Sequence, residues 1–257
     1  MKRSVFVQVL NVLAVIATIV VNGMANALPL NGQNTGEISD RFQVYFVPAG
    51  YVFSIWGLIY LGLILFAVYQ ALPAQRDNPR LRRIDLLFIL SCVANIAWLF
   101  LWHYNRFLLT LPVMLALLGM LIAIYLRLDV GRAVVSTGEK WLVHIPFSVY
   151  LGWVTVATIA NATDVLDYIN WSGWGISPEA WAVIMLGAAT VIASLVALTR
   201  GDVAFMLVII WAFVGIAVKQ AGTPVVAISA WVATVAIIVM LVIGTIVHRK
   251  AREPEMV

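Results

Sequence analysis

Residues 50–71 read GYVFSIWGLIYLGLILFAVYQA, a stretch that contains no charged side chain. A helix needs roughly 20 apolar residues to cross the ~30 Å hydrocarbon core of a bilayer. Other stretches meet this requirement or come close to it, at about 4–27, 85–103, 107–127, 141–161, 180–199, 203–219 and 223–247. The sequence therefore predicts an all-α fold, a polytopic membrane helix bundle with about eight transmembrane helices.

The composition of the 257-residue chain excludes several other classes of protein. Hydrophobic residues make up 63% of the chain and charged residues 11%, whereas a soluble domain is about half apolar and about one quarter charged. This hydrophobicity excludes a disordered chain, and the single cysteine, Cys92, excludes a disulfide scaffold. The net charge of +4 comes from short basic clusters between apolar runs, which is not a nucleic-acid footprint. The expected partners are the lipid bilayer and a hydrophobic small molecule, with no nucleic acid.

The distribution of Lys and Arg predicts the orientation of the spans. With a cytoplasmic N-terminus, 13 of the 16 basic residues fall on the inside, and only Arg41, Arg106 and Lys219 fall outside. Basic residues concentrate in cytoplasmic loops. We therefore expect a multi-pass protein of a bacterial cell membrane, with both termini cytoplasmic and residues 28–50 outside.

The first 27 residues leave an alternative open. A basic start, an apolar middle and the sequence Ala-Asn-Ala at 25–27 are also typical of a cleaved signal peptide. The apolar region of about 20 residues is longer than the 7–15 of a signal. This length favours a retained first helix.

Aromatic and amide side chains recur on single faces of several predicted helices. Trp56 and Tyr60 are spaced i, i+4, and so are Trp153, Ala157 and Asn161, whereas Asn95 and Trp98 share a face of the third span. The predicted orientation brings these groups to one depth, beneath the long segment 28–50. An apolar pocket with a few orienting polar groups and a lid has this layout. The same residues would also serve as interface anchors or helix-packing groups, and spacing leaves both interpretations open.

Three short motifs resemble the TspO/translocator-protein family, the tryptophan-rich sensory proteins. YVFSIWGLIY at 51–60 is similar to the second-helix signature of the family, NIAW at 95–98 to the third-helix motif, and WVTVATIAN at 153–161 to the fifth-helix motif. The resemblance covers about residues 1–170. It implies a five-helix bundle at 1–170 with a ligand cavity. The apolar stretches at 171–257 predict three additional transmembrane helices and a short cytoplasmic tail, which have no counterpart in the five-helix family, so the chain is expected to be a divergent member.

The resemblance also implies a ligand and the residues that bind it. The family binds tetrapyrroles, so the expected function is binding of a flat hydrophobic ligand such as protoporphyrin or haem, as a sensor, carrier or scavenger, with no required cofactor. The corresponding ligand-binding residues are Tyr51, Trp56, Tyr60, Asn95, Trp98, Trp153, Ala157 and Asn161. The chain departs from the family by lacking a proline before Trp56, and the sequence ATDVLD after Asn161 does not match the sterol-binding pattern.

Other functions remain as alternatives. An eight-helix membrane enzyme acting on lipid or pigment needs an acid and a base near its substrate, for which His103, Asp164 and Asp167 are the candidates. Asp164 and Asp167 are expected in the loop after the fifth span. His103 is also a candidate axial haem ligand, although the histidines and Cys92 have no metal-binding spacing. A structural or assembly role, and a homodimer packed through the small residues of the last three helices, are also consistent with the sequence.

Overall fold

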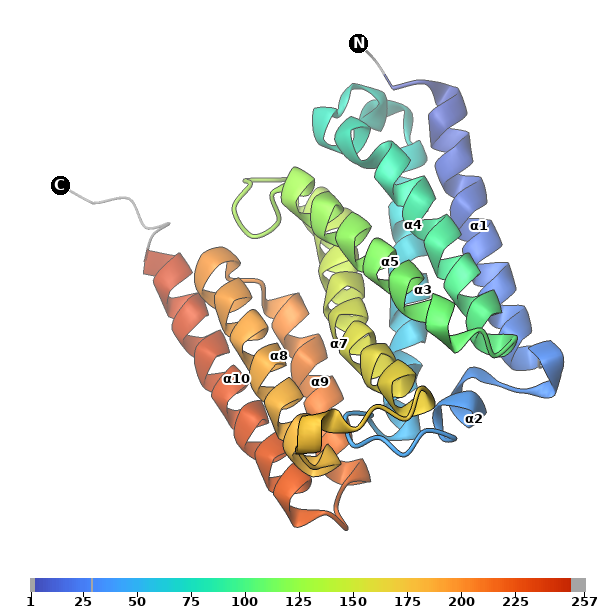
Figure 1. Cartoon of the computed structure of the whole chain (residues 1–257). Helices are drawn as coiled ribbons and strands as arrows, with labels where there is room; N and C mark the ends of the chain where they lie inside the picture. Colours follow the sequence, from blue (N-terminus) through green and yellow to red (C-terminus); the bar gives the residue numbers. More distant parts are fainter. Residues whose placement is uncertain (1–2, 29, 251–257) are drawn as a thin grey trace. The chain divides into compact units, whose positions relative to one another are not determined.

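The computed structural model describes residues 3–28 and 30–250, apart from the side chains of Asn26, Arg249 and Lys250. Lys2 and Arg252, which contribute to the predicted orientation, lie outside this part. The helices are α1 (Val5–Ala27), α2 (Thr35–Ser39), α3 (Ile55–Ala71), α4 (Pro79–His103), α5 (Phe107–Leu128), α6 (Thr137–Glu139), α7 (Ile145–Tyr168), α8 (Pro178–Arg200), α9 (Val203–Lys219) and α10 (Pro224–Lys250) (Figure 1). Single 3₁₀ or π turns occur at Leu30–Gly32, Gly50–Ser54, Pro73–Asp77, Lys140–His144 and Gly173–Gly175.

Within the described residues, 7 helical segments are long and apolar enough to cross a membrane. The helix Val203–Lys219 is apolar but shorter, at 17 residues. This confirms the predicted fold class, an all-α polytopic membrane helix bundle, and makes the chain an integral multi-pass membrane protein.

Two helices extend beyond their predicted ends. α4 begins at Pro79 rather than near residue 85, because the Asn78 side chain caps it by accepting hydrogen bonds from the Arg80 and Leu81 amides. α7 continues to Tyr168 rather than ending near residue 161, since no proline or glycine interrupts residues 153–168. Asp164 and Asp167 therefore lie in the last turns of α7, and their predicted position in a loop is wrong.

The chain divides into two compact units. The first comprises residues 1–43 and 54–170, and the second comprises residues 44–53 and 171–257. The segment 44–53 precedes α3 in the chain, yet it belongs to the unit that contains α8, α9 and α10.

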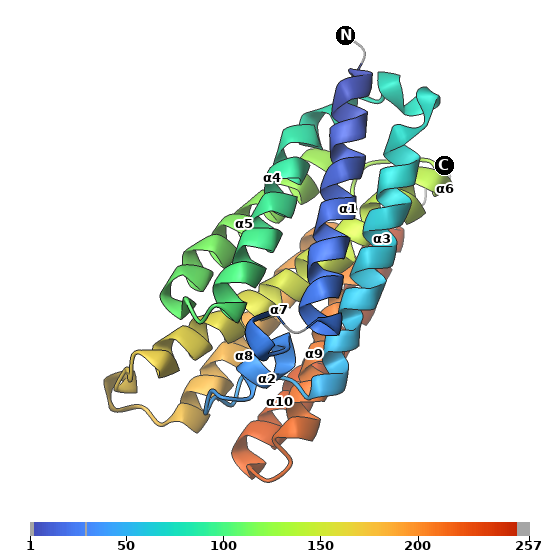
Figure 2. The ribbon, with the colours of Figure 1, turned by 90° about the vertical axis from the view of Figure 1, so that its right-hand side faces the viewer.

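The first unit is a closed ring of five helices. Around the ring, α1 packs against α3, α3 against α7, α7 against α5, α5 against α4, and α4 against α1. Figure 2 shows α1 between α3 and α4. Each long helix of this unit therefore has two neighbours, and side chains from different helices meet inside the ring.

A buried ion pair beside the N-terminal end of α1 links the residues before α1 to α3 and α4. Arg3, which is 4% exposed, donates from Nε to Asp85 Oδ2 on α4 at 2.9 Å and from Nη2 to Asp85 Oδ1. The same guanidinium donates to the Gln70 carbonyl and side-chain oxygens on α3, at 3.2 and 3.0 Å. Asn11 on α1 donates to Asp85 Oδ1 at 2.7 Å. The pairing satisfies two charges that burial would otherwise disfavour.

The second unit is held by small residues. α10 packs against both α8 and α9, and Ala189, Ala193 and Ala197 on α8 are almost fully buried. A Cβ added at Gly244 of α10 would lie 2.6 Å from the Ala197 carbonyl oxygen, so only glycine allows this approach. Gly187, which the sequence also marks as a packing residue, is exposed and has nothing within 4 Å of an added Cβ.

The segment 44–53 is bound to α9. The Ala49 amide donates to the Gly215 carbonyl at 3.1 Å, and Trp211 Nε1 donates to the Val52 carbonyl at 3.1 Å. A Cβ added at Gly215 would lie 2.2 Å from Val52 Cγ2. Gly215 thus packs against this segment rather than against a neighbouring helix.

Tyr45 adds a polar anchor at the start of this segment. Its hydroxyl donates to Glu179 Oε1 on α8 at 3.0 Å, and this hydrogen bond raises the pKa of Tyr45. Gln220 Nε2 donates to the Tyr45 carbonyl at 3.1 Å. Both ends of segment 44–53 are therefore tied to helices of the second unit.

We expect Asp85→Asn to destabilise the first unit by about 3 kcal/mol, because the Arg3 guanidinium loses its buried counter-charge. Thermal unfolding of the detergent-solubilised chain measures the loss. The double variant Arg3→Met with Asp85→Leu should recover most of the stability, because it removes both charges. If Asp85→Asn unfolded at the same temperature as the wild-type chain, a stabilising role for the ion pair would be contradicted.

We expect Gly215→Val to release segment 44–53 from α9, because the added side chain occupies the position of Val52. Hydrogen exchange of the segment's amides should become about ten-fold faster or more, as in a locally opened region. Gly187→Val makes the same change at an exposed position of α8 and should leave this exchange unchanged. Equal exchange in both variants would show that close packing at Gly215 does not hold the segment.

Candidate functional site

Three of the predicted site residues form one aromatic cluster with a fourth ring. The Trp56 and Tyr60 rings on α3 stack, with centroids 5.6 Å apart and planes 23° apart. Trp153 on α7 meets Trp56 edge-on at 6.3 Å, and Tyr150 meets it at 6.2 Å. The i, i+4 spacing of Trp56 and Tyr60 places both rings on the face of α3 that meets α7. We call Trp56, Tyr60, Tyr150 and Trp153 the aromatic cluster.

Asn95 is linked to this cluster by hydrogen bonds. Its Nδ2 donates to the Tyr150 hydroxyl at 3.0 Å, and its Oδ1 accepts from Asn22 Nδ2 at 2.8 Å. Asn22, Asn95 and Tyr150 lie on α1, α4 and α7, and each is at most 5% exposed. Asn22 and Tyr150 are absent from the predicted site residues, although their polar groups inside apolar runs are a signal for interior positions.

Trp98 and Asn161 form a second group. Trp98 Nε1 on α4 donates to Asn161 Oδ1 on α7 at 3.2 Å, and Asn161 Nδ2 donates to Thr110 Oγ1 on α5 at 2.9 Å. The Trp98 ring stacks on Trp102, with centroids 5.3 Å and planes 17° apart. Thr110 is fully buried, and nothing in its sequence neighbourhood identifies it as the partner of an amide on α7.

Burial separates the predicted site residues into two kinds. Asn95, Trp153 and Asn161 are buried, each at 2% exposure. The remaining residues of the first unit are half-buried, namely Trp56, Tyr60, Trp98 and Ala157. Ala157 lies one helical turn from both Trp153 and Asn161 on α7. The half-buried rings offer faces on which a flat molecule can stack.

The amides already form hydrogen bonds within the protein. Asn95 uses both its oxygen and its nitrogen, and Asn161 does the same. Each amide is shown with one accepted and one donated hydrogen bond, and an amide group carries two N–H donors and two acceptor lone pairs. These hydrogen bonds hold both amides in fixed positions between helices.

Tyr51 lies in the other unit. Its ring meets Trp211 on α9 edge-on at 5.4 Å, and 46% of the residue is exposed. The structure thus brings the remaining predicted site residues into the first unit and assigns Tyr51 to segment 44–53. Its position shortly before Trp56 in the chain gives no sign of this separation.

The predicted lid, residues 28–50, is divided between the two units after residue 43. Its first part is fastened to the C-terminal end of α4. Trp102 Nε1 donates to the Thr35 carbonyl at 3.3 Å, and Asn31 Nδ2 donates to the His103 carbonyl at 3.0 Å. The ring of Phe42 lies 5.7 Å from that of Trp102. Residues 30–43 therefore pack against the C-terminal end of α4.

His103 takes part in the same contacts. Its Nε2 lies 3.0 Å from Thr35 Oγ1, and its Nδ1 lies 3.2 Å from the Leu30 carbonyl. Because a carbonyl accepts only, Nδ1 carries the proton in the neutral ring and Nε2 accepts from the Thr35 hydroxyl. Both nitrogens are engaged, so His103 has no nitrogen available as an axial haem ligand in this conformation.

The other two acid–base candidates lie on α7. Asp167 Oδ2 accepts from the Gln43 amide at 3.3 Å, and Asp164 is buried at 4% exposure on α7. Among the described residues, no group of three or more His, Cys, Asp or Glu side chains is arranged to hold a metal ion.

The fold and this interior define an integral, multi-pass helical membrane protein with an aromatic and amide-lined centre. Comparison with protein families gives a match to the family described as TSPO-like protein, over residues 8–243. The chain belongs to this TSPO-like family. The match continues past residue 170, where the resemblance of the motifs ends, through α8 and α9 and into α10. No curated protein and no solved structure matches the chain.

Proposed function

We propose that this protein binds a flat hydrophobic molecule, a tetrapyrrole such as protoporphyrin or haem, against the aromatic cluster of the first unit. The observation that carries the proposal is the stacked, half-buried pair Trp56 and Tyr60, with Trp153 edge-on to it. A flat ring stacking on such a pair gains about 0.5–1.5 kcal/mol per aromatic contact beyond the area it buries. Membership of the TSPO-like family supports the same ligand class.

The residues fit the ring of a tetrapyrrole better than they fit a metal at its centre. The aromatic cluster supplies faces, and Asn95 and Asn161 supply amides for polar substituents. His103 is engaged with Thr35 and Leu30, so iron coordination by this residue is not part of the proposal. Stacking and burial in the bundle would hold the ligand, and the protein would act as its sensor, carrier or scavenger.

We also propose that both termini are cytoplasmic and that residues 30–43 lie outside. Arg3 and Arg76 lie together, since the Arg3 amide donates to the Arg76 carbonyl at 2.8 Å. Arg127 Nη1 donates to the Arg83 carbonyl at 2.8 Å. Basic residues from separate segments of the first unit thus gather at one end, as they do on the cytoplasmic side of membrane proteins.

Cysteine accessibility in intact cells tests this orientation. A cysteine at Gly36, in the Cys92→Ser background, should react with a membrane-impermeant maleimide added outside. A cysteine in the C-terminal tail should react only after the membrane is opened. Labelling of both positions from the outside would contradict the orientation.

Replacement of Trp56 tests the ligand site. We expect Trp56→Leu to weaken protoporphyrin binding by about 1–2 kcal/mol, through lost stacking and incomplete filling of the vacated space. Titration of the purified full-length chain, followed by porphyrin absorbance, measures the change, which is about ten-fold in Kd for each 1.4 kcal/mol.

The matched control is Trp231→Leu, on the exposed surface of α10 in the second unit, where Trp231 is 47% exposed. This variant should keep wild-type affinity. Equal losses at Trp56 and Trp231, or no loss at Trp56 in folded protein, would refute binding at the aromatic cluster.

A further inference from the structure

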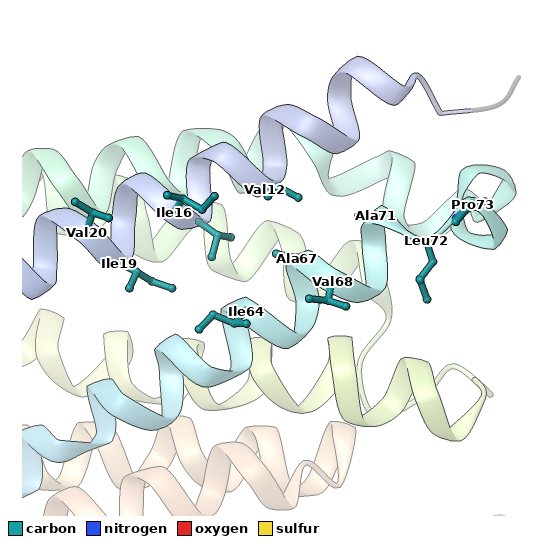
Figure 3. A pocket seen from close by; sticks show the side chains of 11 residues that line it. Val12, Ile16, Ile19, Val20, Ile64, Ala67, Val68, Ala71, Leu72 and Pro73 are labelled. Carbon is teal, nitrogen blue, oxygen red and sulfur yellow. The ribbon is translucent and has the colours of Figure 1, made fainter.

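An apolar groove runs between α1 and α3, away from the aromatic cluster. Its volume is about 580 Å³, and only Val, Ile, Ala, Leu and Pro residues of α1, α3 and the following turn line it. Figure 3 shows Val12, Ile16 and Val20 on the α1 side and Val68 and Ala71 on the α3 side. Ile16, Val20 and Val68 are 50–61% exposed, so the groove is open along its length.

The groove has the length of one membrane leaflet. Residues 12–20 of α1 line it, and at 1.5 Å per residue they span about 12 Å. One leaflet contributes about half of the ~30 Å hydrocarbon core. An open apolar recess at this depth in a membrane-spanning bundle is filled by hydrocarbon rather than by water.

A cation lies at one end of the groove. Leu72 and Pro73 close that end, and Arg76 follows in the same 3₁₀ turn. Arg76 Nε donates to Gln8 Oε1 at 3.3 Å, and Gln8 lies one helical turn before Val12 on α1. This hydrogen bond places the guanidinium about one helical turn beyond Val12, where the groove ends on α1.

Arg76 differs in its partners from Arg3 and Arg80. Arg3 is paired with Asp85, and Arg80 is paired with Glu139. Within residues 3–28 and 30–250, the terminal nitrogens of Arg76, Nη1 and Nη2, have no hydrogen-bond partner, and the residue is half-exposed. A guanidinium with two free NH2 groups matches the geometry of a phosphate group.

We propose that the α1–α3 groove binds one acyl chain of an anionic phospholipid, whose phosphate contacts Arg76. The apolar walls accept the chain, and the free guanidinium selects the charged headgroup. A helix from a second copy is about 10–12 Å across with its side chains, whereas 580 Å³ is in the range of a site for a single small molecule. This site is independent of the proposed tetrapyrrole site, because no lining residue belongs to the aromatic cluster.

Native mass spectrometry of the full-length chain in detergent tests the proposal, with phosphatidylglycerol and phosphatidylcholine of identical chains as probes. We expect one phosphatidylglycerol to bind in preference to phosphatidylcholine. Ala71→Phe, which fills the groove, should weaken this binding about ten-fold or more. Ala17→Phe, at an exposed α1 position outside the groove, should have no effect.

The headgroup contact has its own pair of variants. Arg76→Gln should abolish the preference for phosphatidylglycerol and leave the weaker phosphatidylcholine binding intact, whereas Arg127→Gln, an exposed arginine of α5, should change neither. Inorganic phosphate should not compete at millimolar concentration, because it lacks the chain. Thermal unfolding confirms that each variant is folded, and Ile16→Trp is a second groove-filling variant if Ala71→Phe is not.

Three results would overturn the proposal. The first is equal lipid binding by Ala71→Phe and Ala17→Phe. The second is a retained phosphatidylglycerol preference in Arg76→Gln. The third is loss of a dimer in Ala71→Phe with unchanged lipid binding, which would identify the groove as a contact between two copies. Protoporphyrin affinity of Ala71→Phe should remain at the wild-type value, which separates this site from the proposed function.

Discussion

Polar side chains inside the hydrocarbon region must find partners within the protein, and this constraint organises the five-helix unit. Lipid tails are as apolar as leucine, so apolar burial alone gives little reason for one transmembrane helix to associate with another. Here three groups of hydrogen-bonded side chains, which we call polar layers, join the helices. The first layer joins α1, α3 and α4, the second joins α1, α4 and α7, and the third joins α4, α5 and α7. Their central contacts are Arg3 with Asp85, Asn22 with Asn95 and Tyr150, and Trp98 with Asn161 and Thr110.

The same layers determine what the interior can do. Two of them contain residues of the candidate site, so Asn95 and Asn161 hold helices together and are also the amides that the proposed ligand would meet. If a ligand replaced one of these interior hydrogen bonds, the helix bundle would lose the stabilisation from that bond and the complex would gain a new hydrogen bond. The aromatic faces of Trp56 and Tyr60 carry no such double role, because stacking on them leaves the polar layers intact. The proposed ligand site therefore rests mainly on the rings.

The helices of the second unit associate through close packing of small residues. Hydrogen bonds of Thr190, Ser194 and Thr234 return to carbonyls of their own helices. α8 and α10 instead approach closely at Ala197 and Gly244, where dispersion contacts between backbones replace polar links. This unit also holds segment 44–53 through the close contact at Gly215. Because the chain enters this segment from α2 and leaves it into α3, the second unit anchors the residues that lead into the helix of Trp56.

The sequence by itself determined the membrane-spanning class, the number of apolar helices and the placement of most site residues on shared helix faces. These features follow from local properties, the length of apolar runs and the 3.6-residue period, and so they can be read without a structure. Even there, the ends of α4 and α7 depended on a cap at Asn78 and on the absence of a helix breaker before Tyr168.

Only the tertiary structure decided which polar groups are partners. In the sequence, Arg3 indicates the orientation of the first span and Asp85 marks the start of a span. In the structure these two residues, 82 positions apart in the chain, form one buried ion pair. Tyr51 and Trp56 are neighbours in one motif, but a close contact at Gly215, more than 150 residues away, assigns Tyr51 to another unit. Pairing of this kind depends on which helices are adjacent, and helix adjacency is not encoded in any local pattern. For the same physical reason, the unpaired nitrogens of Arg76 and the groove beside them are visible only in the folded chain.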